Sequence, residues 1–133
     1  MSCAPIPPDI TIRIERGEYR EQGFRVATRL PDGTTAPQSL ATATELVWMV
    51  KAALADADAA AKFTKRFSLN DIVLDDQGAA PGDLKVIILS ADTASLAAAV
   101  YYHQLWVYDE AGRRKPAHSP AKLILGQPVH LPV

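Results

Sequence analysis

The sequence predicts an all-β fold, an antiparallel β-sandwich of about seven short strands with at most one short helix and extended termini. Several segments alternate apolar and polar residues with a period of two, as half-buried strands do. Turn signals rich in Gly, Pro and Asp recur about every ten residues. No internal repeat of fixed period is visible, which argues against a solenoid or a propeller.

Alternation predicts the first two strands. Ile10, Ile12 and Ile14 point to one side of a strand, and the polar residues between them point to the other side. A second alternation runs over 24–30 and ends at "PDG", residues 31–33. Because Pro favours the backbone of a turn and Gly tolerates a positive φ, we expect a chain reversal there.

The segment "ELVWMVKAALADADAAAKFTKRF" has two interpretations. Its many Ala, Leu, Lys and Glu residues suit a single long helix. Against the helix, "ELVWMV" is rich in residues that favour strands, and "DADA" interrupts the apolar spacing. We favour a strand over 44–52, a short helical connection within 54–61, and a strand over 62–67.

Strands are also predicted in the second half of the chain. After a short "IVL" piece, the turn signal "DDQGAAPGD" at 75–83 ends one strand, and the next runs over 84–90. Asp92 is expected to cap a brief helical turn. The reversal in "DEAGRR" and a last strand near "AKLILGQPVHL" follow, and the prolines there suit an edge or a tail.

A strand over 100–108 holds most of the aromatic residues. Its two faces are Tyr101, His103, Leu105 and Val107 on one side, and Tyr102, Gln104, Trp106 and Tyr108 on the other. We interpret His103 as a core or rim residue with a hydrogen-bonded ring nitrogen. Trp48 is expected to fill the space between the two sheets. Tyr101 is placed to reach back to the preceding turn, as in a tyrosine corner.

Proline-rich ends divide the chain into three parts. Residues 1–9 hold three of the 10 prolines and predict an extended N-terminal arm, 10–126 form the sandwich domain, and 127–133 form an extended C-terminal tail. Cys3, the only cysteine, has no partner for an internal disulfide. No signal peptide is recognisable, so we expect synthesis in a cytoplasm.

Charge and hydropathy limit the classes of partner. The chain has 14 Lys and Arg against 15 Asp and Glu, without a basic block that would neutralise phosphates. The longest uncharged run, between Asp92 and Asp109, alternates with a period of two and does not resemble a membrane span. We therefore expect neither a nucleic-acid nor a membrane partner.

No motif in the sequence carries recognisable chemistry. The sequence has no "GxSxG" elbow, Walker loop or "GxGxxG" turn. His118 and His130 make no zinc spacing with His103. Two pairs of acids, Asp56 with Asp58 and Asp75 with Asp76, are interpreted as solvated loop residues rather than as a cation site. The expectation is no catalytic residue, no cofactor and no metal.

The segment "DTASLAAAVYYHQLWVYDEAG", with "LKVIILS" before it, resembles the N-terminal domain of the upper baseplate protein of tailed bacteriophages and its stand-alone relatives in phages and prophages. The positions that match the pattern "DT..L..G.Y.Y.L.V.D..G" are Asp92, Thr93, Leu96, Tyr101, Leu105, Val107, Asp109 and Gly112. Ala99 stands where the family tends to have Gly, and His103 where a second aromatic is common. The correspondence runs from about Ile10 to Leu125.

The resemblance implies an immunoglobulin-like fold and a structural role in the virion. The leading hypothesis is a non-enzymatic, multi-copy virion protein that binds other virion subunits. It would act as an adaptor in the baseplate or tail, or as a decoration (cement) protein on the head, after synthesis in the bacterial host cytoplasm. One alternative is a carbohydrate- or host-surface-binding module, because surface Tyr and Trp can stack on sugar rings. A third is a small hydrolase accessory domain with His103 in a site.

The interface candidates are the two ends of the chain and the second face of the aromatic strand. They are Ile6, Pro7, Pro8, Tyr102, Trp106, Tyr108, Pro128, Val129 and Leu131. The arms are expected to dock on neighbouring subunits. The aromatic face is covered either by a layer of this protein or by another subunit.

Overall fold

Two facing β-sheets account for most of the structure, a computed structural model that describes residues 10–118 and 120–126. The larger sheet has the order β1 (Ile12–Glu15), β11 (Ala121–Gly126), β9 (Ala99–Tyr108), β5 (Glu45–Lys51) and β6 (Phe63–Arg66), and β10 (Arg114–Pro116) also pairs with β9. The smaller sheet has the order β2 (Arg20–Arg25), β8 (Asp83–Ile88) and β7 (Ile72–Leu74). A separate hairpin consists of β3 (Ala27–Arg29) and β4 (Thr35–Pro37).

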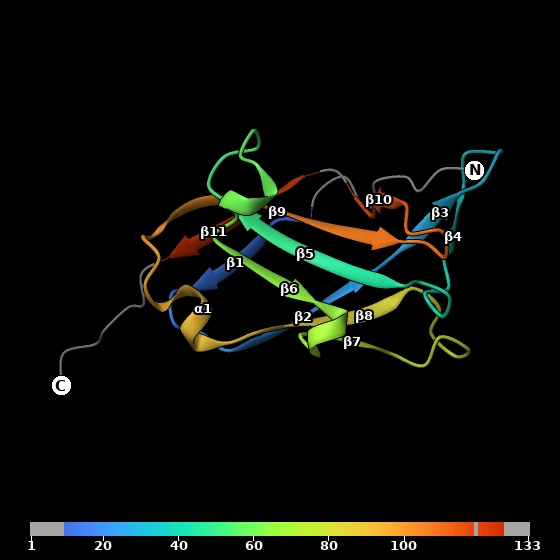
Figure 1. Cartoon of the computed structure of the whole chain (residues 1–133), viewed down its shortest axis with the longest axis horizontal. Coiled ribbons are helices and arrows are strands. Elements are labelled where there is room, and N and C mark those ends of the chain that lie inside the picture. The colour runs from blue at the N-terminus through green and yellow to red at the C-terminus, as the bar shows by residue number, and fades with distance from the viewer. Residues whose placement is uncertain (1–9, 119, 127–133) are drawn as a thin grey trace.

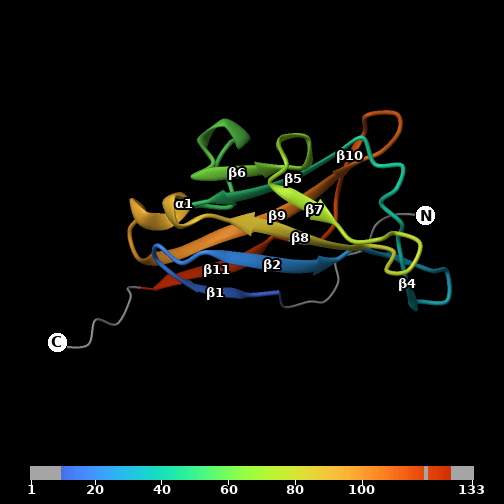
Figure 2. The ribbon, with the colours of Figure 1, turned by 90° about the horizontal axis from the view of Figure 1, so that it is seen from below.

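The predicted all-β, immunoglobulin-like sandwich is confirmed. The strands β2, β8 and β7 face β11, β9, β5 and β6, which is the B-E-D against G-F-C-C′ order of variable-type immunoglobulin domains. The helical segments are short: η1 (Asp58–Ala60), η2 (Phe67–Leu69) and α1 (Ser90–Ala94). Figures 1 and 2 show α1 at one end of the sandwich, and the β3–β4 hairpin with β10 at the other.

The expectation of a purely antiparallel sandwich was wrong at one pair of strands. β1 pairs in parallel with β11, from Ile12 opposite Leu123 to Glu15 opposite Gly126. The remaining pairings between described strands are antiparallel. Alternation in β1 determines which side chains face inward, but it carries no information about which strand lies beside it.

The number of strands was also underestimated, because the described residues hold eleven rather than about seven. The alternation over 24–30 is not one strand: β2 begins at Arg20 and ends at Arg25, and β3 begins at Ala27. At the break, the Val26 amide donates to the Gly82 carbonyl at 2.8 Å, and the Val26 carbonyl accepts from the Gln38 amide at 3.0 Å. With these two bonds, the chain leaves the small sheet at Val26 and enters the β3–β4 hairpin.

The 44–67 segment is strand, short helix and strand, so the long-helix interpretation does not apply. The reversal at 31–33 is also confirmed, with Gly33 at φ +87°. Asp92 is not the N-cap that we expected, because α1 begins at Ser90 and Leu89 precedes it. The Asp92 carboxylate instead accepts from the Leu89 amide at 2.7 Å, and it pairs with the buried Lys65 ammonium of β6 at 2.5 Å.

The core lies between the two sheets. Inward side chains of β5 and β8 contribute Leu46, Trp48, Val50, Leu84, Val86 and Ile88, which are almost completely buried. Ile12 and Ile14 of β1 extend this layer toward one edge, as alternation predicted. Burial of these apolar side chains is the main stabilising contribution to the fold.

Candidate functional site

His103 lies in the core and is hydrogen-bonded through both ring nitrogens. The side chain is 1% exposed. Trp48 Nε1 donates to its Nδ1 at 3.2 Å, so the ring proton is on Nε2, which donates to the Ile10 carbonyl at 2.9 Å. Burial, together with the nearby His118, lowers the pKa of His103 to about 4, although the bond to Ile10 opposes this shift. The prediction of a core residue is confirmed.

The position of His118 was not predicted, because the sequence pattern placed this residue in a loop. Its ring is buried, and its centroid lies 5.3 Å from that of His103. The segment between β10 and β11 follows β9: the Ala117 amide donates to the Leu105 carbonyl at 2.9 Å, and the Leu105 amide donates to His118 Nε2 at 3.0 Å. His118 is therefore fixed in the core by the backbone bond of the preceding Ala117 and by the bond to its own ring nitrogen. The Ser and Pro that follow it in the sequence do not suggest this position.

The place of the usual inter-sheet disulfide is taken by packed rings. In immunoglobulin domains this disulfide joins the B and F strands beside a buried Trp. Here Phe24 of β2 and His103 of β9 lie 6.0 Å apart between ring centroids, and Trp48 packs against both, at 6.2 and 5.7 Å. The Tyr101 hydroxyl donates to the Ala97 carbonyl at 2.7 Å, which confirms the predicted tyrosine corner.

Among the described residues, the core holds neither a metal-binding cluster nor an unpaired polar side chain. No described group of three or more His, Cys, Asp or Glu residues is arranged to hold a metal ion. No buried side-chain nitrogen or oxygen of the described residues lacks a hydrogen-bond partner. Both buried histidine rings take part in hydrogen bonds within the fold.

The outer face of β9 is partly covered by the protein itself. The guanidinium carbon of Arg114, from β10, lies 3.8 Å from the centre of the Trp106 ring. Arg114 Nη1 also pairs with Asp58 Oδ2 at 2.5 Å, and Asp58 pairs with Lys51 at 2.8 Å. Hydrogen bonds from Lys51 and Arg114 lower the pKa of Asp58. Arg114 therefore occupies one face of the Trp106 ring, a surface on which a sugar could otherwise stack.

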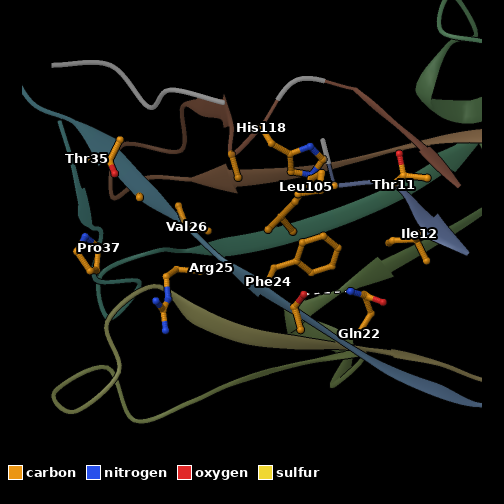
Figure 3. A pocket seen from close by; sticks show the side chains of 14 residues that line it. Thr11, Ile12, Gln22, Phe24, Arg25, Val26, Thr35, Pro37, Leu105 and His118 are labelled. Carbon is orange, nitrogen blue, oxygen red and sulfur yellow. Dashed lines mark hydrogen bonds between the residues drawn. The ribbon is translucent and has the colours of Figure 1, made fainter. Parts of the chain in front are cut away.

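A groove opens between β1 and β2, the edge strands of the two sheets on one side of the sandwich. Its volume is about 460 Å³. Its walls include Ile10, Ile12, Phe24 and His118, and Thr35 and Pro37 lie along it toward the hairpin. Figure 3 shows Phe24, Leu105 and His118 pointing toward one another, and Arg25 pointing away from them.

η2 and the neighbouring strand β7 expose apolar side chains. Phe67, Leu69 and Val73 are 37%, 65% and 49% exposed. We call these three residues the edge patch. The edge patch was not predicted, although four apolar residues among polar neighbours in 66–73 are a detectable signal.

Polar side chains brace this turn from both of its ends. The Ser68 amide donates to Glu45 Oε1 at 2.9 Å, and the Ser68 hydroxyl donates to the other oxygen of the same carboxylate. The Arg66 amide donates to Asp71 Oδ2 at 3.1 Å, and the Ile87 amide donates to the Asp71 carbonyl at 2.8 Å. The turn is thus attached to β5 in one sheet and to β8 in the other.

Bonding to Ser68 keeps the Glu45 carboxylate charged. Burial raises the pKa of Glu45, but hydrogen bonds from Ser68 and Leu46 and the nearby Arg66 outweigh this, so that the pKa is lowered. Asn70, at the end of η2, adopts a left-handed φ of 63°. Its backbone amide donates to the Phe67 carbonyl at 3.0 Å. Leu69 is therefore presented on a turn of defined geometry.

The predicted interface residues fall into two groups. Tyr102, Trp106 and Tyr108 lie together on the outer face of β9 and are half-buried. The other candidates, namely Ile6, Pro7, Pro8, Pro128, Val129 and Leu131, lie outside the described residues, as do the arm 1–9 and the tail 127–133. The structure brings the first group together and leaves the second group as a prediction.

Neither the known protein families nor the curated proteins include a match to this chain. Among the helices that the structure describes, none has the length and apolar character needed to span a membrane.

Proposed function

We propose that this protein is a non-enzymatic adaptor of a tailed-phage virion that binds other virion subunits through the edge patch. Phe67, Leu69 and Val73 expose apolar surface at the side of the sandwich where β6 and β7 end the two sheets. Exposed apolar side chains that are rimmed by polar residues are typical of protein–protein interfaces. This braced patch is the observation that carries the proposal.

Pre-organisation supports a docking role for the turn. Binding costs less when the contacting residues are already held in one conformation. Glu45 and Asp71 fix the backbone of 66–71 from two different sheets. Leu69, the most exposed large apolar residue among those that the structure describes, is therefore ready to enter an apolar depression on a partner.

The virion context rests on the resemblance of "DTASLAAAVYYHQLWVYDEAG" to the baseplate-protein family. In the structure, residues of this segment contribute the tyrosine corner and the central strand β9. A sandwich of this kind supplies rigidity, and its surface supplies the contacts. In this proposal the protein is made in the host cytoplasm and is present in several copies in the baseplate, in the tail or on the head.

A virion-incorporation assay tests this proposal. Particles are purified from cells that produce the phage with the wild-type gene, with Leu69→Asp, or with the control Leu54→Asp, and the protein is quantified by mass spectrometry. Leu54 is the matched control because it is 59% exposed and lies outside the edge patch. We expect Leu69→Asp to reduce incorporation by about tenfold or more, as loss of an interface anchor does.

Two results would contradict the proposal in different ways. Absence of the wild-type protein from purified particles would remove the virion role. Equal incorporation of Leu69→Asp and Leu54→Asp would leave the virion role in place and would reject the edge patch as the docking surface. Circular dichroism of the isolated variants checks that the fold is intact in each case.

A further inference from the structure

The outer edge of β2 carries no strand in the described part of the fold. β2 ends the smaller sheet on the side away from β7, and among the described strands it pairs with β8 alone. Figure 2 shows β2 and β7 on opposite sides of β8. The groove of about 460 Å³ lies along this edge, because residues 22–27 form one of its walls. A further strand can therefore add to the sheet here.

Alternate backbone groups of β2 point away from the sheet at this edge. The Val26 amide donates to the Gly82 carbonyl at 2.8 Å, and the antiparallel register of β2 and β8 continues from this pair. In such a ladder every second residue bonds to the neighbouring strand. The even-numbered residues of β2 therefore bond to β8. Glu21, Gly23 and Arg25 direct their amides and carbonyls outward.

Gly23 lies in the middle of this edge, and the described fold does not require a glycine there. Its φ is outside the left-handed region, and no atom beyond its chain neighbours lies within 4 Å of the position that a Cβ would take. The Gln22 side chain donates an exposed hydrogen bond to the Gly23 carbonyl at 3.2 Å, drawn as a dashed line in Figure 3. Glycine weakens a strand interior and often marks the close approach of another backbone. A second strand at this edge would account for it.

Charge selects one register for two antiparallel copies of β2. The outward backbone groups require odd-numbered residues to lie opposite odd-numbered residues. When the pair is centred on Gly23, Glu21 of each copy lies opposite Arg25 of the other. Centring on Glu21 or on Arg25 places like charges opposite each other, and the registers between place a charge opposite Gly23. Opposite charges across strands are stabilising and like charges are destabilising, so the Gly23-centred register is favoured.

Both charged side chains are able to bind a second partner. The Arg25 side chain is 68% exposed, and its Nε and Nη2 donate to the Asp83 carboxylate at 2.6 and 3.1 Å. Its Nη1 carries two further donors. Glu21 is exposed, and its Oε2 accepts from the Tyr19 hydroxyl at 3.0 Å. The ion pairs of a dimer can therefore form without breaking either of these bonds.

We propose that this protein forms a homodimer in which the β2 edges of two copies pair antiparallel, centred on Gly23 and flanked by two Glu21–Arg25 ion pairs. The smaller sheets of the two copies then form one continuous sheet. β7 lies at the far edge of each smaller sheet, so the edge patches of both copies stay accessible. The inference goes beyond the virion role and does not depend on it.

Two charge-reversed variants test the dimer, each alone and then mixed. Glu21→Arg places two arginines opposite each other at both pairs, and Arg25→Glu places two glutamates there. We expect each variant alone to weaken dimerisation by about tenfold or more, measured by sedimentation in low-salt buffer. An equimolar mixture has opposite charges at both pairs and should dimerise as the wild type does. Glu110→Arg, at an exposed position outside β2, is the control and should also behave as the wild type.

Three results would overturn the dimer. The first is a wild type that sediments as a monomer up to about 1 mM. The second is a dimer that neither variant weakens. The third is a mixture that associates no better than each variant alone, although circular dichroism shows both to be folded. Leu69→Asp should dimerise as the wild type does, so failure of the edge patch and failure of the dimer are separate results.

Discussion

Trp48 Nε1 donates a hydrogen bond to His103 Nδ1 across the adjacent strands β5 and β9, at 3.2 Å and out of contact with solvent. This bond requires a neutral His103, since a protonated Nδ1 has no lone pair to offer. Burial lowers the pKa of His103 to about 4. The central Trp of the sandwich is thus paired with a group whose protonation opposes folding.

Stability should therefore fall as the pH decreases from about 6.5 to about 4. The unfolded chain binds this proton near pH 6.5 and the folded protein only near pH 4, so the contribution of the neutral ring is complete above pH 6.5 and is lost on acidification. The shift corresponds to about 3 kcal/mol. Urea unfolding between pH 4 and 7.5 measures it, and His103→Phe should show a flatter pH dependence. Parallel curves for the two proteins would show that another group is responsible.

Tyr101→Phe should destabilise the fold by about 1–2 kcal/mol, because it removes the hydroxyl that donates to the Ala97 carbonyl at 2.7 Å. The matched control is Tyr102→Phe, at the next position of β9 but on the outer face. We expect the control to stay within about 0.5 kcal/mol of wild type. Urea denaturation of both variants gives the comparison, and similar losses would remove the special role of the corner.

Gln77 joins the 75–83 loop to Leu40 through four hydrogen bonds. Its Oε1 accepts from the amides of Leu40 and Gly82, both at 2.8 Å, and its Nε2 donates to the carbonyls of Asp75 and Asp83 at 2.9 and 3.0 Å. Both ends of the side-chain amide are therefore required at this position.

Gln77→Glu should cost about 2–4 kcal/mol at pH 7, because it loses both donors and places a carboxylate oxygen against two carbonyls. Acidification should reduce the difference from wild type as the carboxylate becomes protonated. Gln22→Glu, at a side chain with one exposed hydrogen bond to Gly23, is the control and should be nearly neutral. Thermal unfolding at pH 7 and pH 4 measures both variants; a pH-independent loss would point to packing instead.

Gly82→Ala and Gly33→Ala separate a backbone clash from backbone strain. Both glycines have a positive φ, +86° and +87°, but a Cβ at Gly82 would lie 2.2 Å from the Val26 carbonyl oxygen, whereas nothing lies within 4 Å at Gly33. We expect about 1 kcal/mol for Gly33→Ala and about 3 kcal/mol or more for Gly82→Ala. Chemical denaturation measures both, and equal losses would contradict the close approach of Val26 to Gly82.

Most strand positions were predictable, because alternation is a local property. Ile12 and Ile14, and Tyr101 with His103, face the core, as the period of two indicated, whereas β5, which holds Trp48, is buried on both of its faces. The turns at 31–33 and 109–112 follow from Pro, Asp and Gly. The short strands β4 and β10 were missed, because three residues are too few to show a period, and β3 was predicted only as the continuation of the strand that ends at Arg25.

By itself, the sequence determined the all-β class, the inward faces of β1 and β9 and the tyrosine corner, because these depend on residues close together in the chain. Only the tertiary structure decided that β1 lies beside β11, that His118 packs on His103, and that Arg114 covers Trp106. Each of these contacts joins separate strands or connections. Their partners are selected by packing in three dimensions, which alternation along one strand does not encode.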